Sequence, residues 1–390
     1  MCIRDSSRVI TTGVPFLLIA SDARAASMGD MGVATSVDTY SQFWNPSKYV
    51  FSETKSGFGL SYTPYLSKLV NDISLGNLTY FNRINERSAF AVSLRYFSLG
   101  EIEIIQDEFS QALIEKPNEM TMDISYSLRL ADQFSMGVAL RYLRSDLRIQ
   151  AVDETAKAAS SYAVDISAYF QGEEQSYGDV DGRWRAGMII QNLGPKIKYD
   201  ESGRETFLPT NLRLGTGFDF LLDQYNKVSV TAEFAKLLVP TPPILGYEYN
   251  FTDNNENGVY DEDIDELGEQ TTGELIVYNG QTTDVDFLQG VFQSFSDAPG
   301  GFSEELKEFT WALGAEYVYD DSFALRAGYF NESEDKGARK FLALGAGFKF
   351  SGTRVDLSYL FSASRVPSPL ENTLRFSLTF DFGSNSYLEY

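Results

Sequence analysis

The residues best suited to chemistry lie in one acidic stretch past the middle of the chain. Residues 253–261 (DNNENGVYD) match most of an EF-hand-like calcium loop, with oxygen-bearing side chains at positions 1, 3, 5 and 9 and a glycine at position 6. Position 12 is isoleucine instead of the bidentate glutamate, so a nearby carboxylate would have to replace it. The candidate calcium ligands are Asp253, Asn255, Asn257, Asp261 and Asp263. The alternative is a solvated acidic loop that binds no ion.

Other common catalytic chemistry is excluded by residue types that are missing or scarce. The 390-residue chain contains no histidine and one cysteine, Cys2. A Ser-His-Asp triad, a His-ligated zinc site and an imidazole base are therefore impossible, as are an intramolecular disulfide and a CxxC motif. There is also no GxSxG nucleophile elbow. The sequence predicts no catalytic residue and no organic cofactor.

The negative charge is concentrated in one segment. The formal net charge is −23, which argues against a nucleic-acid partner. Residues 240–308 hold sixteen acidic side chains and one lysine, so this segment carries fifteen of the excess negative charges. It also contains apolar pieces, LIVY at 275–278 and FLQGVFQSF at 287–295, which a purely solvating loop does not need. We predict a docking surface for a protein partner made by Phe287, Leu288, Val291, Phe292 and Phe295.

The sequence on both sides of this segment alternates with the period of β-strands. The longest apolar run, residues 14–20, is too short for a transmembrane helix, whereas alternation of large apolar and small or polar residues recurs fourteen times. The predicted strands are 56–66, 72–82, 88–99, 120–131, 134–146, 160–171, 183–193, 209–222, 227–239, 308–320, 322–331, 340–351, 353–363 and 372–382. The prediction is an all-β fold, a closed antiparallel transmembrane barrel.

The lengths of the connections support a barrel of the outer membrane. Connections after even-numbered strands are mostly short and those after odd-numbered strands mostly long, as expected for periplasmic turns and external loops. This parity predicts that both termini are periplasmic and that residues 240–308 form a large extracellular loop. A soluble β-sandwich or propeller also alternates, but it does not predict this parity.

One face of the predicted strands carries charged residues and glycines. Examples are Arg141, Glu316 and Arg326, and Gly314 and Gly328, all in the small or polar register. Because an arginine or lysine facing hydrocarbon at mid-membrane costs roughly 2–4 kcal/mol, this register must face the lumen. We interpret the charges as structural ion pairs rather than as a solute pathway, and the glycines as space for a plug.

The first residues allow two interpretations. Residues 14–20 followed by Ala23-Arg24-Ala25 resemble a short signal peptide with an A-x-A cleavage site. We prefer the alternative that the export signal is missing and that residues 1–12 are a leader remnant or foreign start. The remaining boundaries are a lumenal segment at 13–55, the barrel at 56–382 and a periplasmic tail at 383–390.

Several separated motifs resemble those of one family. The pattern ARAASMGDMGVA at 23–34, followed by WNP at 44–46, is similar to the N-terminal hatch of FadL-like outer-membrane barrels. Within that superfamily, PFLLI at 15–19, NLGPKI at 192–197, FLPTNLRLG at 207–215 and KLLVPTPP at 236–243 resemble the PorV (LptO) family of the type IX secretion system of Bacteroidota. Residue 47 is serine where the hatch motif usually has alanine. The resemblance assigns Arg24, Met28, Gly29, Trp44, Asn45 and Pro46 to a hatch within the lumen.

The resemblance implies protein transport without catalysis. Proteins of this kind are thought to accept substrates from a SprA/Sov-like translocon, hold their C-terminal signal domains at the cell surface and deliver them to a PorU-like sortase. Outer-membrane lipid is the other expected partner. The alternatives are a FadL-like transporter that moves a hydrophobic solute through a gated lumen, and a surface deacylase, which the missing histidine disfavours.

Overall fold

Fourteen long strands form the body of the protein in a computed structural model that describes residues 9–66, 72–104, 112–148, 157–178, 180–199, 203, 205–247, 249–252, 254, 266–270, 275–364 and 373–384. They are β1 (Thr54–Pro64), β2 (Ile73–Arg83), β3 (Ser88–Leu99), β6 (Asn118–Ala131), β7 (Phe134–Asp146), β8 (Ala159–Gln171), β10 (Val180–Leu193), β11 (Asn211–Leu221), β12 (Asn226–Leu237), β17 (Phe309–Tyr319), β18 (Phe323–Asn331), β19 (Lys340–Phe350), β20 (Thr353–Ser362) and β21 (Leu374–Ser384).

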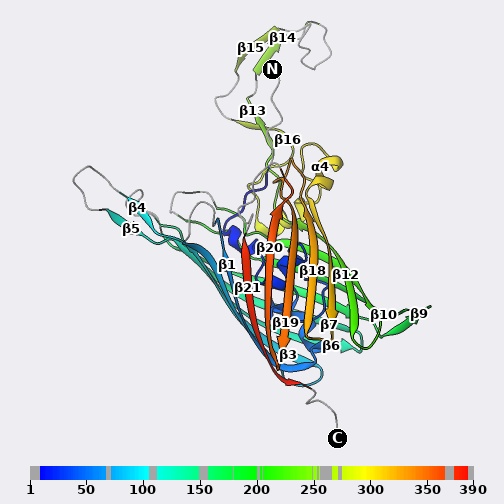
Figure 1. The fold of residues 1–390 in the computed structure, drawn as a ribbon. Helices are drawn as coiled ribbons and strands as arrows, with labels where there is room; N and C mark the ends of the chain where they lie inside the picture. Colours follow the sequence, from blue (N-terminus) through cyan, green and yellow to red (C-terminus); the bar gives the residue numbers. More distant parts are fainter. Residues whose placement is uncertain are drawn as a thin grey trace.

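These strands close into a barrel (Figure 1). Each strand pairs antiparallel with the next one in chain order, and β1 closes the ring on β21 through pairs such as Leu60 with Leu378. The predicted fourteen-stranded antiparallel barrel is confirmed, and the fourteen predicted strands match these long strands to within a few residues. A short strand, β9 (Gln175–Tyr177), extends the edge of β10.

The alternation that predicted the strands separates the two faces of the barrel wall. In β6, Met122, Ile124 and Tyr126 point outward and are more than half exposed, whereas Asp123 and Ser125 point inward and are buried. Because successive side chains of a strand lie on opposite faces, one register meets the apolar surroundings and the other meets the lumen. No helix in the described part of the chain is long and apolar enough to cross a membrane.

The two ends of the barrel differ, as the connection lengths predicted. At one end, connections such as 132–133 and 351–352 are tight turns; we call this the short-turn end. The other, long-loop end carries the hairpins and helices that Figure 1 shows mostly above and beside the barrel. These are β4 (Ile102–Ile104) with β5 (Leu113–Glu115), β13 (Ile244–Gly246) with β16 (Ile276–Asn279), β14 (Tyr249–Thr252) with β15 (Glu266–Gln270), α3 (Phe287–Gln293) and α4 (Phe302–Lys307).

Residues 9–52, the N-terminal segment, pack within the barrel. They contain η1 (Pro15–Leu18), α1 (Ala23–Ser27), α2 (Ser41–Trp44) and η2 (Pro46–Phe51), and most of these residues are buried. Phe16 and Leu17 pack near the long-loop end against Leu75, Phe97 and other buried side chains, whereas Ser52 accepts a hydrogen bond from Arg83 at the short-turn end. The core is therefore built between this segment and the inner face of the wall.

The N-terminal segment runs the length of the lumen before β1 begins. The backbone N–H of Gly13 donates to Phe207 in a connection of the long-loop end, and β21 ends beside Thr54 at the short-turn end. The first and last described residues thus lie at opposite ends. Residues 1–8 and 385–390 lie outside the described part of the chain, so the periplasmic location of both termini stays a prediction.

Candidate functional site: the filled lumen and the outer loop

Arg24 joins the N-terminal segment to the barrel wall. Its guanidinium donates to Glu316 on β17 from Nε at 3.0 Å and from Nη2 at 2.7 Å, and to Asp38 from Nη1 at 2.7 Å. Glu316 also pairs at 2.7 Å with Arg326 on β18, which in turn pairs with Asp356 on β20 at 2.7 Å. All five groups are buried or nearly so. Buried charges are tolerated when they are paired and hydrogen-bonded, and this network meets that condition.

Trp44, Asn45 and Pro46 fix the turns of the N-terminal segment. The indole of Trp44 donates to Asp22 at 2.7 Å, and Asp22 also caps α1 by accepting the N–H of Ala25 at 2.8 Å. The Asn45 amide donates at 3.0 Å to the carbonyl oxygens of Val33 and of Ala168 on β8. Pro46 begins η2, where a missing N–H costs nothing. These residues thus hold the segment to itself and to the wall.

Inward-facing glycines let the backbone of the N-terminal segment approach the wall. A Cβ added at Gly314 would lie 2.6 Å from the Met28 carbonyl oxygen, and one at Gly328 would overlap the Met28 backbone. Gly29 has a φ of +90°, and a Cβ there would lie 2.9 Å from the Tyr329 carbonyl oxygen. The lumenal glycines therefore make room for the N-terminal segment, and its role as a plug stays a prediction.

The charges of the lumenal register pair with each other, as predicted. Arg141 contacts Asp123 at 2.5 Å and Asp165 at 3.0 Å, and Arg185 contacts Asp219 at 2.7 Å. These pairs brace the wall from strand to strand. Glu233 also binds the N-terminal segment. It pairs with Arg213 and accepts hydrogen bonds from the backbone N–H groups of Gly32 and Val33 at 2.9 Å.

Arg95 on β3 differs from Arg141, Arg185 and Arg213 in its partners. It is buried, its Nη2 donates to the carbonyl oxygen of Ile19 at 2.7 Å, and its guanidinium lies 4.5 Å from the centre of the Phe43 ring. Its Nε and Nη1 atoms have no hydrogen-bond partner. Arg95 therefore holds the N-terminal segment through carbonyl and aromatic contacts instead of a carboxylate.

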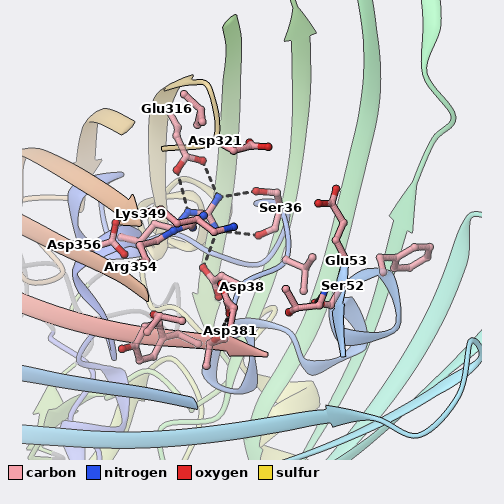
Figure 2. A pocket seen from close by; sticks show the side chains of 18 of the residues that line it. Ser36, Asp38, Ser52, Glu53, Glu316, Asp321, Lys349, Arg354, Asp356 and Asp381 are labelled. Atoms are coloured by element: carbon pink, nitrogen blue, oxygen red, sulfur yellow. Dashed lines mark hydrogen bonds and ion pairs between the residues drawn. The ribbon is translucent and has the colours of Figure 1, made fainter. Parts of the chain in front are cut away.

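A polar cavity of about 170 Å³ lies near the short-turn end (Figure 2). Its wall combines the N-terminal segment, including Ser36 and Asp38, with strand residues of both charges, such as Lys349, Arg354 and Asp381. The Arg24–Glu316 pair lies on this wall. Sequence reasoning missed this cavity, because its lining comes from separate strands whose register only the closed barrel fixes.

The outer loop, residues 240–308, exposes apolar side chains at the long-loop end. Phe292 on α3 is 75% exposed, and Leu288 and Phe295 are each about half exposed. Phe287 and Val291, the other predicted docking residues, are partly buried, and Phe287 lines a hollow on the outside of the wall. The structure also exposes Phe302 on α4 by 77%, which sequence reasoning missed. A seven-residue and a six-residue helix are too short to give a clear helical period in the sequence.

A buried charged cluster fixes the base of the outer loop to the barrel. Lys236 at the end of β12 contacts Glu305 at 3.1 Å and Glu308 at 2.5 Å, and Lys336 contacts Glu304 at 2.7 Å and Glu308 at 2.9 Å. Burial favours protonation, but hydrogen bonds from Lys236 and other donors hold the pKa of Glu308 below its usual value. The exposed side chains of α3 and α4 are thus presented on a fixed base.

Asp297 lies in the same cluster without a cation of its own. Its Oδ2 accepts the backbone N–H of Thr241 at 3.0 Å, and its buried Oδ1 has no hydrogen-bond partner. Burial raises the pKa of Asp297 to about 6, and the nearby Glu305 and Glu308 act in the same direction. This carboxyl group is therefore the part of the loop base that responds to mildly acidic pH.

The predicted calcium ligands Asp253, Asn255, Asn257, Asp261 and Asp263 lie outside the described residues. Among the residues that the structure does describe, no group of three or more histidine, cysteine or acidic side chains is arranged to hold a metal ion. The calcium site stays a prediction from the sequence.

Comparisons with known proteins agree with this architecture. Residues 3–244, more than half of the chain, match the family model described as "Type IX secretion system protein PorV". No curated protein matches the chain.

Several solved structures match this chain at low sequence identity. The Ralstonia pickettii toluene transporter TbuX is 11% identical, covers 94% of this chain and 100% of its own, and has a TM-score of 0.47. The Pseudomonas putida toluene transporter TodX is 11% identical, with coverage of 96% and 98% and a TM-score of 0.46. A Pseudomonas aeruginosa FadL homologue is 12% identical, with coverage of 97% and 100% and a TM-score of 0.43.

Proposed function

The chain belongs to the PorV family of type IX secretion system proteins, and we propose that it acts in that system as an outer-membrane shuttle. It accepts substrates with C-terminal signal domains from a SprA/Sov-like translocon and delivers them to a PorU-like sortase at the cell surface. That the chain is an outer-membrane barrel component of type IX secretion follows from the family and the fold.

The main support for the proposal is the group of exposed apolar side chains on the outer loop. Leu288, Phe292 and Phe302 are 50%, 75% and 77% exposed. Helix α4 nevertheless rests on the buried Lys236–Glu308 and Lys336–Glu304 pairs, and Gly290 of α3 lies against Phe207 and Pro240. Apolar side chains held outward by a fixed base are typical of a protein-binding surface, because a partner can bury them with little loss of conformational freedom.

The filled lumen supports a shuttle over the alternative, a FadL-like transporter of a hydrophobic solute. Transport would be favoured by an apolar cavity beneath residues 28–44 with an opening in the wall. The cavity next to the N-terminal segment is instead polar, and the larger apolar hollow lies on the outside of the wall. Inside, the segment is held by paired charges and by backbone contacts at glycines.

A native pull-down tests the proposal. The full-length protein is extracted in mild detergent, and the co-purified proteins are identified for the wild type and for a Phe292→Ser/Phe302→Ser variant. We expect the wild type to retain a giant barrel and secreted C-terminal domains, and the variant to lose them. The matched control is Phe350→Ser, since Phe350 is 73% exposed but ends β19 at the short-turn end. Retention by the loop variant, or equal loss by the control, would contradict the proposal.

An uptake assay distinguishes the proposed shuttle from a FadL-like transporter of a hydrophobic solute. Uptake of toluene into cells that produce the protein should equal uptake into cells that lack it, because the lumen is filled. A clear increase, lost when the polar cavity is filled, would favour the transporter.

A further inference from the structure

The outer face of the barrel carries an apolar hollow of about 920 Å³, here called the outer-wall hollow. A barrel wall is normally convex on its outside, so a hollow of this size is unusual. Two neighbouring rows of outward side chains form its floor and cross the strands from β1 to β8. One row is Phe58, Tyr80, Val92, Ile124, Leu140 and Val164; the other is Leu78, Leu94, Met122, Tyr142 and Tyr162.

The register of the strands makes these rows continuous. Tyr80 pairs with Val92, which pairs with Ile124, so that side chains of successive strands lie directly beside each other. Five inter-strand spacings from β1 to β8 give a length of about 24 Å, longer than the ~15 Å depth of one membrane leaflet. The hollow can therefore take an extended hydrocarbon chain.

An irregularity in β10 ends the hollow at the long-loop end. The pairing of β10 with β8 shifts register between Ile190 and Leu193, and Asn192 has a φ of +59°. Bulges bend a strand and change its twist, and here the residues that follow, Gly194 and Pro195, line the hollow. Phe287 of the outer loop also lines it.

Two basic residues lie close in sequence to residues that line this end of the hollow. Arg144 follows Tyr142 by two residues on β7, so it shares the outward face, about 7 Å further along the strand. Lys196 follows Pro195 directly, and its ammonium lies 4.5 Å from the centre of the Phe207 ring. Asp146 opposes this charge, but Arg144 and Arg148 share that single carboxylate. The chain has a net charge of −23, so two basic residues beside an apolar hollow indicate a site for a negatively charged group.

We propose that the outer-wall hollow binds one membrane lipid with a phosphate-bearing, anionic headgroup. The acyl chains lie along the rows of apolar side chains, and the headgroup contacts Arg144 and Lys196 at the long-loop end. The charge complementarity selects an anionic lipid over a zwitterionic one. The hydroxyl of Tyr142, which lies 3.3 Å from the Ser160 hydroxyl, adds a polar group at the boundary between chain and headgroup.

Native mass spectrometry of the full-length protein in detergent tests the site. The probes are dimyristoyl phosphatidylglycerol, which is anionic, and dimyristoyl phosphatidylcholine, which is zwitterionic. We expect one bound phosphatidylglycerol and a preference on the order of tenfold over phosphatidylcholine, because each basic residue near an anionic lipid strengthens binding. Inorganic phosphate should not displace the lipid, which separates a lipid site from a phosphate site. Displacement by phosphate would overturn the proposal.

Two variants with matched controls locate the site. Arg144→Gln/Lys196→Gln should abolish the preference. The control Lys307→Gln/Lys340→Gln removes two cations at the same end, one on α4 and one on β19, and should preserve the preference. Val92→Trp should weaken binding of both lipids by filling the hollow. Its control is Val230→Trp on β12, since the two valines are 38% and 37% exposed.

The proposal can still be tested if one variant fails to fold. Heat-modifiable migration on gels reports whether each barrel is folded, and if Val92→Trp fails to fold, the charge variant carries the test. Equal binding of the two lipids by the wild type, or equal loss in the controls, would overturn the proposal. It would also be overturned if the hollow variants released a co-purified protein while lipid binding stayed unchanged, since that result assigns the face to a protein partner.

Discussion

The N-terminal segment and the outer loop use charge in opposite ways. Inside the barrel, Arg24, Glu316 and Arg326 are buried and paired, so they hold a segment of the chain in place. Among the described residues of the outer loop, buried pairs such as Lys236–Glu308 lie at the base, whereas Phe292 and Phe302 are exposed. The comparison indicates that the lumen is filled and held by paired charges, and it supports the proposal that the outer loop binds a partner.

The largest expected effect comes from breaking the lumenal network. Arg24→Met leaves the buried carboxylates of Glu316 and Asp38 without their shared cation, and we expect a loss of about 3–5 kcal/mol in the free energy of unfolding. The measurement is urea unfolding in detergent micelles. Arg24→Lys keeps one charge and should lose less. If the methionine variant were as stable as the wild type, the network would not hold the segment.

A second variant displaces the N-terminal segment without changing any charge. Gly328→Ala places a methyl group against the backbone of Met28, and we expect a loss of about 1–3 kcal/mol and increased protease cleavage within residues 13–51. Gly76→Ala is the control, because the nearest atom to its added Cβ is 4.0 Å away. Equal protease resistance in the two variants would mean that the close approach at Gly328 is not required.

The base of the outer loop should respond to pH through Asp297. Its pKa of about 6 in the folded protein lies above the ordinary value of 3.8, so the folded state binds this proton more tightly than the unfolded state does. The contribution of Asp297 to the stability of the loop base is therefore largest below pH 4 and falls, by on the order of 1 kcal/mol after allowance for solvent screening, as the pH rises through 6.

Hydrogen exchange of α4 between pH 4 and pH 7, corrected for the intrinsic exchange rate, measures this effect. Asp297→Asn should remove most of the pH dependence in this window. A profile that is unchanged in the asparagine variant would assign the titration to another group.

The smallest expected effect concerns the predicted calcium ligands. If residues 253–263 bind calcium, adding a chelator should increase protease cleavage between residues 253 and 269 while leaving the barrel heat-modifiable. Asp253→Asn/Asp261→Asn should show the cleaved pattern even with calcium present. Identical cleavage with and without chelator would assign these residues to a solvated acidic loop.

The wall was predictable from the sequence because its signal is local. In β21, Leu374, Phe376 and Leu378 alternate with Arg375 and Ser377, and any barrel built from such strands must turn the charged register inward. The glycines in that register likewise indicated a filled lumen. The resemblance of residues 23–46 to a hatch supplied the residues that fill it.

Features that depend on several strands at once were not predictable. The pairing of Arg24 with Glu316 joins residues 292 positions apart, and the rows of the outer-wall hollow depend on the register of six strands. The path of the N-terminal segment was not predictable either, because its contacts with Phe97 and Leu208 leave no pattern in the sequence. Helices α3 and α4 were missed because each spans less than two turns.

Secretion itself tests the central claim most directly. The Leu288→Ser/Phe292→Ser/Phe302→Ser variant changes only exposed side chains, and keeps Lys236, Lys336 and the acids of the loop base. It would replace the wild-type chain in cells, and the surface display of a type IX substrate would be measured. We predict a folded, heat-modifiable barrel and a loss of display, with normal display for Phe350→Ser. Normal display by the triple variant would contradict the assignment of docking to the outer loop.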